Sequence, residues 1–418
     1  MKILLCAYSF PPISGPQSSR WLKLIKYISR RWDVDVLTIN PAKGYGRYSA
    51  DLLKEVPSNV RIFRTYPGIM HRIVYSRYKN SSSVRYQKPK NSKKEMILRK
   101  IYRAVSHIFI PDRMIEWLPF ALREGKKLLN ENKYRLIISS AFPFSSHIVA
   151  FFLKRWSSLP WIADYGDPWA LCSPSLLDRK IEEILVRSMD RIIVTTEETR
   201  RGYLSCYSLS ENKVIVIPQG FEEELYNRVK PITSDNFMMV FTGNLSYSAR
   251  GPERFFDALT MIKEKDFKMV ITGYPSPNVV GYIKKIGINE KVEFTGFISQ
   301  EEVIALQKGA SVLVSFGWKG GYQIPGKIFE YMAARRPILH ITYDEKDVAA
   351  KIIKNYNKGI VVENDPISIY KGIEKLYSLW KQNEYEGTFD LSLDDFLDDF
   401  SWKKLGERLE RVIEDVLA

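Results

Sequence analysis

The sequence predicts an α/β protein made of two Rossmann-like, doubly wound domains. Its 418 residues are too many for one typical core and suit two domains of about 200 residues each. Short apolar runs alternate with amphipathic stretches along the whole chain, which is typical of parallel sheets covered by helices on both faces. The alternation restarts after a linking stretch at 218–236.

The expected first domain covers residues 1–217, and its elements follow from runs of β-branched and aromatic residues between amphipathic segments. Strands are expected at 3–7, 34–39, 60–64, 136–139, 161–163, 191–195 and 214–217. Helices are expected at 17–31, 118–130, 145–156, 176–188 and 197–205. Ligands of such a sheet bind at the carboxyl ends of its strands.

The expected second domain covers residues 218–399 and repeats the same alternation. Strands are expected at 238–242, 268–272, 292–295, 311–315, 338–341 and 360–363. Helices are expected at 252–263, 278–285, 300–308 and 346–355, with a further one that opens just after Pro325. A last helix near 402–417 has its apolar residues on one face, at Leu405, Leu409, Val412 and Val416.

Composition narrows the class of protein. Hydrophobic residues make up 45% and aromatic residues 13%, enough for a core in each half. No run of 18 apolar residues exists, so no membrane span is expected. The 3 cysteines are odd in number and lack CxxC spacing, which argues against a disulfide framework or a zinc site. We expect a cytoplasmic protein.

The formal charge of +15 calls for an anionic partner: nucleic acid, an anionic lipid leaflet or a phosphorylated substrate. Basic residues concentrate between 72 and 103, and 96–110 reads as a basic amphipathic helix. Such a helix can lie in a membrane interface, so peripheral contact with an anionic membrane is expected through 72–110. The alternative is a helix packed on the core with a solvated basic face.

The stretch 320–339 reads as a glycine-rich turn, a helix and a buried strand. A loop that leads into a helix N-terminus offers unpaired N–H groups to an anion. Lys327 adds a full charge in the first turn, and the Glu330 carboxylate can accept two hydrogen bonds from a ribose diol. Together they indicate a nucleotide site. The alternative is that Glu330 only favours the helix dipole and Lys327 is solvated.

Residues 326–339 resemble the donor-binding segment of GT-B glycosyltransferases of family 4. That family usually carries two glutamates eight positions apart, and the second holds the ribose. Glu330 matches the second, whereas Tyr322 stands where the first would be. The resemblance implies the GT-B fold, in which the two domains face each other across a cleft, with the last helix, 400–418, packed back on the first domain.

The same resemblance assigns two glycine loops to the donor phosphates. Gly15 fits the loop of the first domain, although Pro16 replaces the usual second glycine, and Arg20 follows as a further candidate. Gly243 fits the loop of the second domain. There Asn244 stands where the family has an arginine, and Arg250 retains the second cation. The segment with Phe297 and Ile298 corresponds to the one that contacts the nucleobase.

The acceptor is expected near 139–147 and 160–169, both at strand ends. The second stretch resembles a segment of bacterial surface-polysaccharide glycosyltransferases, with Gly166 in place of the usual arginine. Asp167 is the candidate that orients or deprotonates an acceptor hydroxyl. The alternative is that Asp167 caps the next turn. His147 is interpreted as a structural histidine.

No Asp-x-Asp pair stands where a metal on a nucleotide-sugar would bind, and the acidic run at 390–399 is interpreted as solvated. We therefore expect metal-independent transfer without a cofactor, with Arg250, Lys327 and helix dipoles stabilising the leaving group. The resemblance implies a retaining transferase that uses a UDP- or GDP-linked sugar. Its implied acceptor is a lipid-linked glycan of bacterial surface polysaccharide synthesis, at the inner face of the cell membrane.

Two other functions remain open. A nucleotide-sugar epimerase shares the two-domain architecture but needs acidic groups and a histidine around the sugar, and the 4 histidines form no persuasive cluster. A non-enzymatic RNA- or membrane-binding protein could use the basic stretch. That stretch lacks the aromatic stacking pattern of a single-strand binder, so nucleic acid is not the expected partner.

Overall fold

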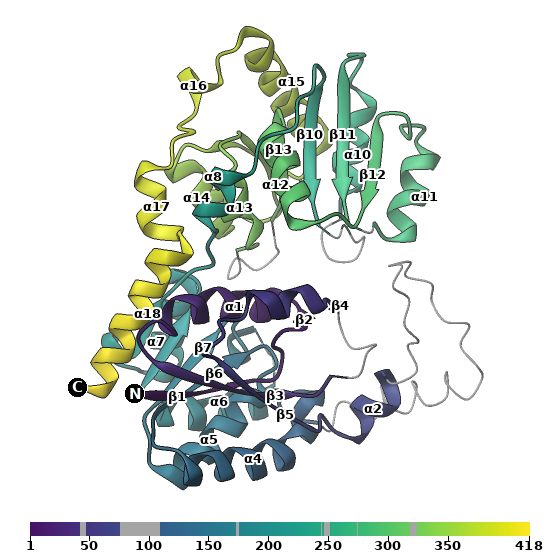
Figure 1. The fold of residues 1–418 in the computed structure, drawn as a ribbon. Helices are drawn as coiled ribbons and strands as arrows, with labels where there is room; N and C mark the ends of the chain where they lie inside the picture. The colour runs from purple at the N-terminus through teal and green to yellow at the C-terminus, as the bar shows by residue number, and fades with distance from the viewer. Residues whose placement is uncertain are drawn as a thin grey trace. The chain divides into compact units, whose positions relative to one another are not determined.

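Two parallel sheets organise the protein (Figure 1). The computed structural model describes residues 1–41, 47–75, 109–172, 175–243, 245, 251–273, 275–317 and 324–418. Contacts divide the chain into a first unit, Met1–Pro218 with Leu405–Ala418, and a second unit, Gln219–Lys404. The 7-stranded sheet has the order β5-β3-β1-β6-β7-β8-β9, and the 6-stranded sheet has the order β12-β11-β10-β13-β14-β15. The expected α/β fold with two Rossmann-like domains is confirmed.

The first unit alternates strand and helix around its sheet. Its strands are β1 (Lys2–Ala7), β3 (Asp33–Ile39), β5 (Arg61–Thr65), β6 (Tyr134–Ala141), β7 (Trp161–Tyr165), β8 (Arg191–Val194) and β9 (Val214–Val216). Its helices are α1 (Pro16–Ile28), α2 (Ile69–Tyr75), α4 (Leu118–Glu131), α5 (Ser145–Ser157), α6 (Leu176–Ser188), α7 (Glu197–Tyr207) and most of α18 (Trp402–Leu417). A short antiparallel pair, β2 (Ile13–Ser14) and β4 (Arg47–Tyr48), accompanies them.

The second unit repeats the pattern. Its strands are β10 (Phe237–Thr242), β11 (Phe267–Thr272), β12 (Val292–Gly296), β13 (Val312–Phe316), β14 (Ile338–Thr342) and β15 (Gly359–Glu363). Its helices are α8 (Glu223–Arg228), α10 (Glu253–Thr260), α11 (Pro277–Lys285), α12 (Gln300–Gly309), α13 (Lys327–Ala333), α14 (Val348–Asn355), α15 (Pro366–Gln382), α16 (Tyr385–Thr388) and α17 (Asp394–Phe400).

Two parts of the chain differ from the expectation: the linking stretch contains α8, and the long helix α15 lies where no helix is predicted. Part of the acidic run forms α17, whose Phe396 and Phe400 are buried while Asp394 and Asp398 stay exposed, in keeping with the solvated interpretation. Within that run Asp399 accepts a hydrogen bond from the Tyr356 hydroxyl at 2.5 Å. The predicted basic helix at 96–110 falls almost wholly outside the described residues.

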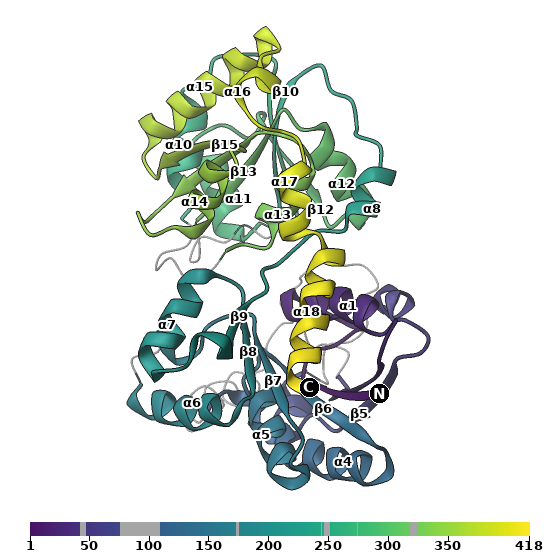
Figure 2. The same cartoon turned by 90° about the vertical axis from the view of Figure 1, so that its left-hand side faces the viewer.

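The last helix, α18, lies beside α1 within the first unit (Figure 2). A Cβ at Gly406 would come within 2.6 Å of the Tyr27 side chain, so the glycine lets the two helices approach closely. Arg31 on the turn after α1 forms an ion pair with Glu414 of α18. The apolar face of α18 is buried, with Leu405, Leu409 and Ile413 fully enclosed.

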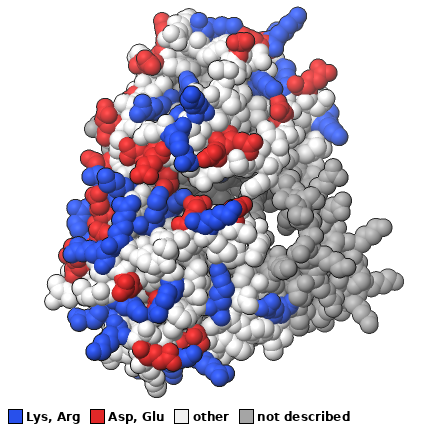
Figure 3. All heavy atoms as spheres, in the orientation of Figure 1, with Lys and Arg blue, Asp and Glu red and all other residues white. Residues whose placement is uncertain are grey.

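Charges of both signs are interspersed on the face of the molecule that Figure 3 shows. Exposed ion pairs such as Arg187–Glu183 and Arg228–Glu301 illustrate this mixing. Much of the basic excess predicted for residues 72–103 falls on residues beyond the described ranges. The face shown in Figure 3 therefore carries charges of both signs rather than a single-sign patch.

A buried ion pair fixes the middle of the first unit. The Arg20 guanidinium on α1 donates to both carboxylate oxygens of Asp164 on β7, at 3.0 Å each, and neither side chain is exposed. The same guanidinium donates to the carbonyls of Ile217 and Pro218 at 2.9 and 2.7 Å, where the chain leaves β9. The Trp21 indole N–H adds a bond to Asp164 at 2.8 Å. One side chain thus ties a helix, a central strand and the end of the sheet together.

We expect Arg20→Met to destabilise the first unit by about 3–5 kcal/mol, because it leaves the Asp164 carboxylate buried without its cation. Urea unfolding followed by tryptophan fluorescence measures the loss. The matched control is Arg187→Met on α6, which breaks only an exposed pair with Glu183 and should cost about 1 kcal/mol or less. Equal effects of the two substitutions would contradict the structural role assigned to Arg20.

Candidate functional site

In the second unit, Lys327 and Gly243 lie against each other at the carboxyl end of β10. The Lys327 ammonium donates to the Thr242 carbonyl and lies 3.3 Å from the Thr242 hydroxyl. Gly243 has a φ of 128°, and a Cβ there would come within 2.6 Å of the Lys327 Nζ. Only glycine meets both conditions, so the structure brings together two residues that the sequence assigned to the donor phosphates.

A chain of buried hydrogen bonds holds this corner in place. The Tyr331 hydroxyl accepts the Thr242 backbone N–H at 2.8 Å, and the Gln307 amide donates to the Thr242 hydroxyl at 3.0 Å. The Tyr226 hydroxyl of α8 donates in turn to Gln307 at 2.6 Å. Because these bonds are buried, they restrain the end of β10 against the first turn of α13.

Glu330 lies one turn after Lys327 on α13 and is half-buried. Burial raises the pKa of Tyr226 well above its usual value, and the negative charge of Glu330 raises it further. A partly exposed carboxylate in this position can still accept hydrogen bonds from a diol.

The other residues assigned to the donor lie at strand ends or beyond the described ranges. Phe297 follows β12 with 62% of its surface exposed, while Ile298 packs on the core of the second unit. Gly296 and Gly273 pair across the ends of β12 and β11 through a hydrogen bond of 2.7 Å. Asn244, Arg250 and Tyr322 fall outside the described residues, so their roles stay predictions.

In the first unit, Gly15 is the N-cap of α1 with an extended backbone, φ 172°. No atom lies within 4 Å of the position its Cβ would take, so the N-terminus of α1 is open there. Its predicted phosphate contact stays a prediction. Arg20, the further candidate after Gly15, turns away from this opening, because its guanidinium is buried on Asp164 and two carbonyls. The expectation that Arg20 contacts the donor is therefore wrong.

The loop after β7 carries Asp167 with an exposed side chain. The protein around it desolvates the carboxyl and raises its pKa. Beneath the loop lies Glu182 of α6, fully buried, which accepts the Ala170 backbone N–H at 2.9 Å. Glu182 also accepts the hydroxyls of Tyr203 at 2.6 Å and Tyr207 at 2.5 Å. This network holds the Asp167 loop from below.

Gly166, which stands in place of the family's usual arginine, lies against Gln17 of α1. A Cβ at position 166 would come within 1.0 Å of the Gln17 Nε2 atom, so any larger residue would displace that amide. Gln17 is 8% exposed, and its Oε1 accepts no hydrogen bond from any described residue. Sequence reasoning missed this residue, since nothing in the sequence connects residue 17 with residue 166.

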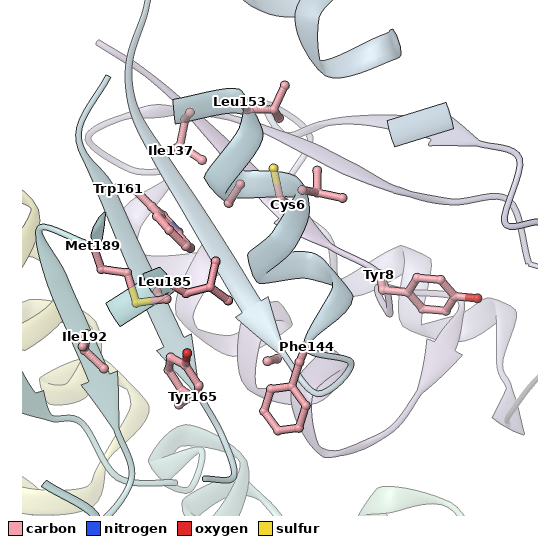
Figure 4. Packing of buried hydrophobic residues seen from close by; sticks show 14 of the residues in the cluster. Cys6, Tyr8, Ile137, Phe144, Leu153, Trp161, Tyr165, Leu185, Met189 and Ile192 are labelled. Carbon is pink, nitrogen blue, oxygen red and sulfur yellow. The ribbon is translucent and has the colours of Figure 1, made fainter. Parts of the chain in front are cut away.

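His147 lies below the same loops, fully buried between Tyr165 and Trp161 (Figure 4 labels the two aromatic residues). The Trp161 indole N–H donates to the Ser139 hydroxyl at 2.7 Å, and that hydroxyl lies within hydrogen-bond distance of His147 Nδ1, at 2.8 Å. Burial lowers the pKa of His147 to about 3, in keeping with the structural interpretation of this residue.

Two features of the described residues bear on the class of protein. No group of three or more His, Cys, Asp or Glu side chains gathers there in a way that could hold a metal ion. Among the helices that the structure describes, none combines the length and apolarity needed to cross a bilayer.

Family models match both halves of the chain. Residues 17–225 match the model described as Glycosyltransferase Family 4. Residues 236–378 match the model described as Glycosyl transferases group 1. The first match covers half of the chain.

Similar proteins agree with these matches. An uncharacterised glycosyltransferase of Methanocaldococcus jannaschii, MJ1607, is 25% identical over 338 residues, which cover 74% of this chain and 82% of that one. The sucrose-phosphate synthase of Thermosynechococcus elongatus superposes with a TM-score of 0.71 at 15% identity, covering 99% and 98% of the two chains. Alr3699/HepE of Anabaena, solved in complex with UDP, superposes with a TM-score of 0.66 at 14% identity, covering 99% and 100%. The structural likeness confirms the GT-B fold.

The buried histidines predict how stability depends on pH. Burial lowers the pKa of His71 to about 4 and that of His147 to about 3, whereas an unfolded histidine titrates near about 6.5. Below about pH 6.5 the unfolded state binds protons that the folded state refuses, so stability falls as pH falls, by at most about 1.4 kcal/mol per pH unit for each histidine. The urea midpoint at pH 7.5, 6 and 5 measures this loss.

The matched variant is His147→Asn, which lacks the titrating ring but keeps the other ionisable groups. Its urea midpoint should fall less steeply between pH 7.5 and 5 than that of the wild type. An identical slope in the two proteins would show that His147 titrates normally in the folded state.

Proposed function

The chain belongs to glycosyltransferase family 4, and from this premise we propose that it is a retaining hexosyltransferase using a nucleoside diphosphate sugar. The observation that carries the proposal is the corner of the second unit where the Lys327 ammonium lies against Gly243, with Glu330 one turn further along α13. A cation beside glycine backbone suits a diphosphate, and a carboxylate at this spacing suits the ribose diol.

Each donor group has a stated partner in this proposal. Lys327 neutralises charge that develops on the leaving diphosphate, and Arg250 supplies the second cation. The backbone of Gly243 approaches the phosphates, Glu330 accepts the ribose hydroxyls, and the segment with Phe297 and Ile298 contacts the base. The UDP complex of the similar Anabaena protein supports UDP as the first nucleotide to test.

The proposed chemistry is a front-side substitution without a metal ion. The acceptor hydroxyl attacks the anomeric carbon on the face that the diphosphate leaves, and the leaving phosphate takes the hydroxyl proton. Asp167 accepts a hydrogen bond from that hydroxyl and orients it. Most of the rate enhancement then comes from positive charge placed in advance around the leaving group.

The proposed acceptor is a lipid-linked glycan of bacterial surface polysaccharide synthesis, handled by a cytoplasmic enzyme peripheral to the inner face of the membrane. The stretch assigned to membrane contact, 72–110, falls mostly outside the described residues. The described surface offers further support on α6, where Leu177, Lys180, Ile184 and Arg187 are all exposed. Their spacing places apolar and basic side chains on one face, as in helices that lie in a lipid interface.

The donor assignment predicts selective binding of one nucleoside diphosphate. In calorimetric titrations with UDP, GDP, ADP and CMP, we expect one diphosphate to bind and Glu330→Gln to weaken it by about 1–3 kcal/mol, since a charge-assisted hydrogen bond is lost. The matched control is Glu374→Gln, an exposed carboxylate on α15, which should leave affinity unchanged.

Two results would contradict the proposal. One is equal affinity of the wild type and Glu330→Gln for the bound nucleotide. The other is an epimerised sugar as the product when the enzyme is incubated with a nucleoside diphosphate sugar alone, which would indicate an epimerase.

The membrane assignment predicts that the protein sediments with vesicles of phosphatidylcholine containing phosphatidylglycerol, and less with phosphatidylcholine alone. Raising the salt concentration should release it, because the basic side chains contribute through screened attraction. Leu177→Ser with Ile184→Ser should reduce sedimentation, whereas Ile367→Ser, an equally exposed residue on α15, should not. A wild-type protein that stays in the supernatant with both vesicle types would refute the assignment.

A further inference from the structure

An aromatic stack stands at the carboxyl ends of β6 and β7 and exposes one of its rings. Phe144 stacks on Trp169 with centroids 5.1 Å apart and planes 18° apart, and both side chains are buried. Phe142 meets Phe144 edge to face at 5.7 Å, yet 46% of its own surface is exposed. Figure 4 shows Phe144 and Tyr165 near the arrowheads of these strands. The outer ring is thus supported from beneath and open above.

The register of the sheet places residue 142 beside the loop that carries Asp167. Ala141 of β6 pairs with Tyr165 of β7, and the Gly166 N–H donates to the Ala141 carbonyl at 3.1 Å. Phe142 and Asp167 therefore leave adjacent strands at the same edge of the sheet. The network around Glu182 holds the Asp167 loop, so the aromatic face and the carboxylate are presented on restrained backbone.

A second polar group lies at this edge. The Gln17 amide fills the space beside Gly166, and its Oε1 is buried without a hydrogen bond from any described residue. A buried carbonyl oxygen that accepts nothing is costly, and a ligand hydroxyl would remove that cost. The edge therefore combines an aromatic face with two oxygen acceptors, the Asp167 carboxylate and the Gln17 carbonyl.

We propose that this edge is the acceptor subsite and that it takes a neutral pyranose, whose C–H face stacks on Phe142 while its hydroxyls donate to Asp167 and Gln17. The inference rests on the proposed glycosyltransferase reaction and deepens it by naming the chemistry of the acceptor's terminal unit. The face of an aromatic ring is electron-rich, so it attracts the slightly positive C–H groups of a sugar ring.

The same groups disfavour the other occupants. A phosphate would bring negative charge next to the Asp167 carboxylate, which cannot donate a hydrogen bond to it when ionised. A lipid tail would bury both acceptors without satisfying them. A sugar ring is the ligand class that satisfies the aromatic face and the two acceptors together.

Saturation-transfer NMR on the full-length protein tests the proposal, with the methyl glycosides of glucose, galactose, mannose and N-acetylglucosamine as probes. We expect at least one glycoside to receive saturation on the C–H protons of one ring face. Phe142→Trp, which keeps the aromatic face, should bind it within about twofold of the wild type, whereas Phe142→Leu and Phe142→Ala should lose about tenfold in affinity.

Phe142→Leu separates stacking from simple apolar contact. If it binds the glycoside as well as the wild type does, or if no glycoside in the panel receives saturation, the proposal is overturned. UDP titration on the same samples distinguishes failure of the acceptor subsite from failure of the proposed glycosyltransferase function. Unchanged UDP binding with no glycoside signal rejects only the acceptor subsite, whereas loss of binding for all four nucleotides rejects the proposed function itself. The thermal midpoint of each variant verifies that the exposed ring was replaced without unfolding the protein.

Discussion

The first unit depends on one buried interaction, the Arg20–Asp164 ion pair. Two charges removed from water are tolerated only when their hydrogen bonds are well satisfied, and here the guanidinium is bonded to a carboxylate and to the carbonyls of Ile217 and Pro218. Asp164 precedes Tyr165, Gly166 and Asp167, so the pair also sets where the β7 loop begins. Arg20 lies on α1, three residues after Gln17, and therefore fixes the amide against Gly166 as well. A single guanidinium positions both sides of the proposed acceptor edge.

Because Arg20 is bonded in the interior of the first unit, other cations must neutralise the charge of a bound diphosphate. A cation bonded on all sides in the interior is not available to a ligand without a cost of several kcal/mol. In the proposed transition state, Lys327 and Arg250 of the second unit therefore supply the positive charge that balances the leaving diphosphate. Lys327 is held by the Thr242 carbonyl in a fixed direction, which reduces the reorganisation needed when charge develops beside it. The network from Tyr226 through Gln307 to Thr242 serves the same end, because it restrains the backbone that the ammonium contacts.

Local patterns predicted most of the fold, and long-range pairings explain what they missed. The strand predicted at 338–341 and the helix predicted after Pro325 correspond to β14 and α13. Both could be predicted because a buried apolar run and a helix start depend on only a few neighbouring residues. Helix α15 was legible too, since Ile369, Ile373 and Leu376 recur at helical spacing, yet it was not assigned. The placement of Lys327 beside Gly243 agrees with the predicted grouping. The Arg20–Asp164 pair, by contrast, joins positions 144 apart, and Gln17 fills a space beside Gly166 that only the folded chain creates.

The two units differ in the kind of group they present, and this difference has a physical rationale. The corner around Lys327 and Gly243 lies one helical turn from the Glu330 carboxylate, and an ammonium with a carboxylate suits the diphosphate and ribose of the proposed donor. The first-unit edge offers an aromatic ring, an amide and a carboxylate, and the missing arginine at position 166 removes a cation from it. Glycine at position 166 leaves out the positive charge of an arginine and also leaves room for the neutral Gln17 amide. In a metal-independent reaction such a division keeps positive charge with the leaving group and away from the attacking hydroxyl, whose nucleophilicity a neighbouring cation would reduce.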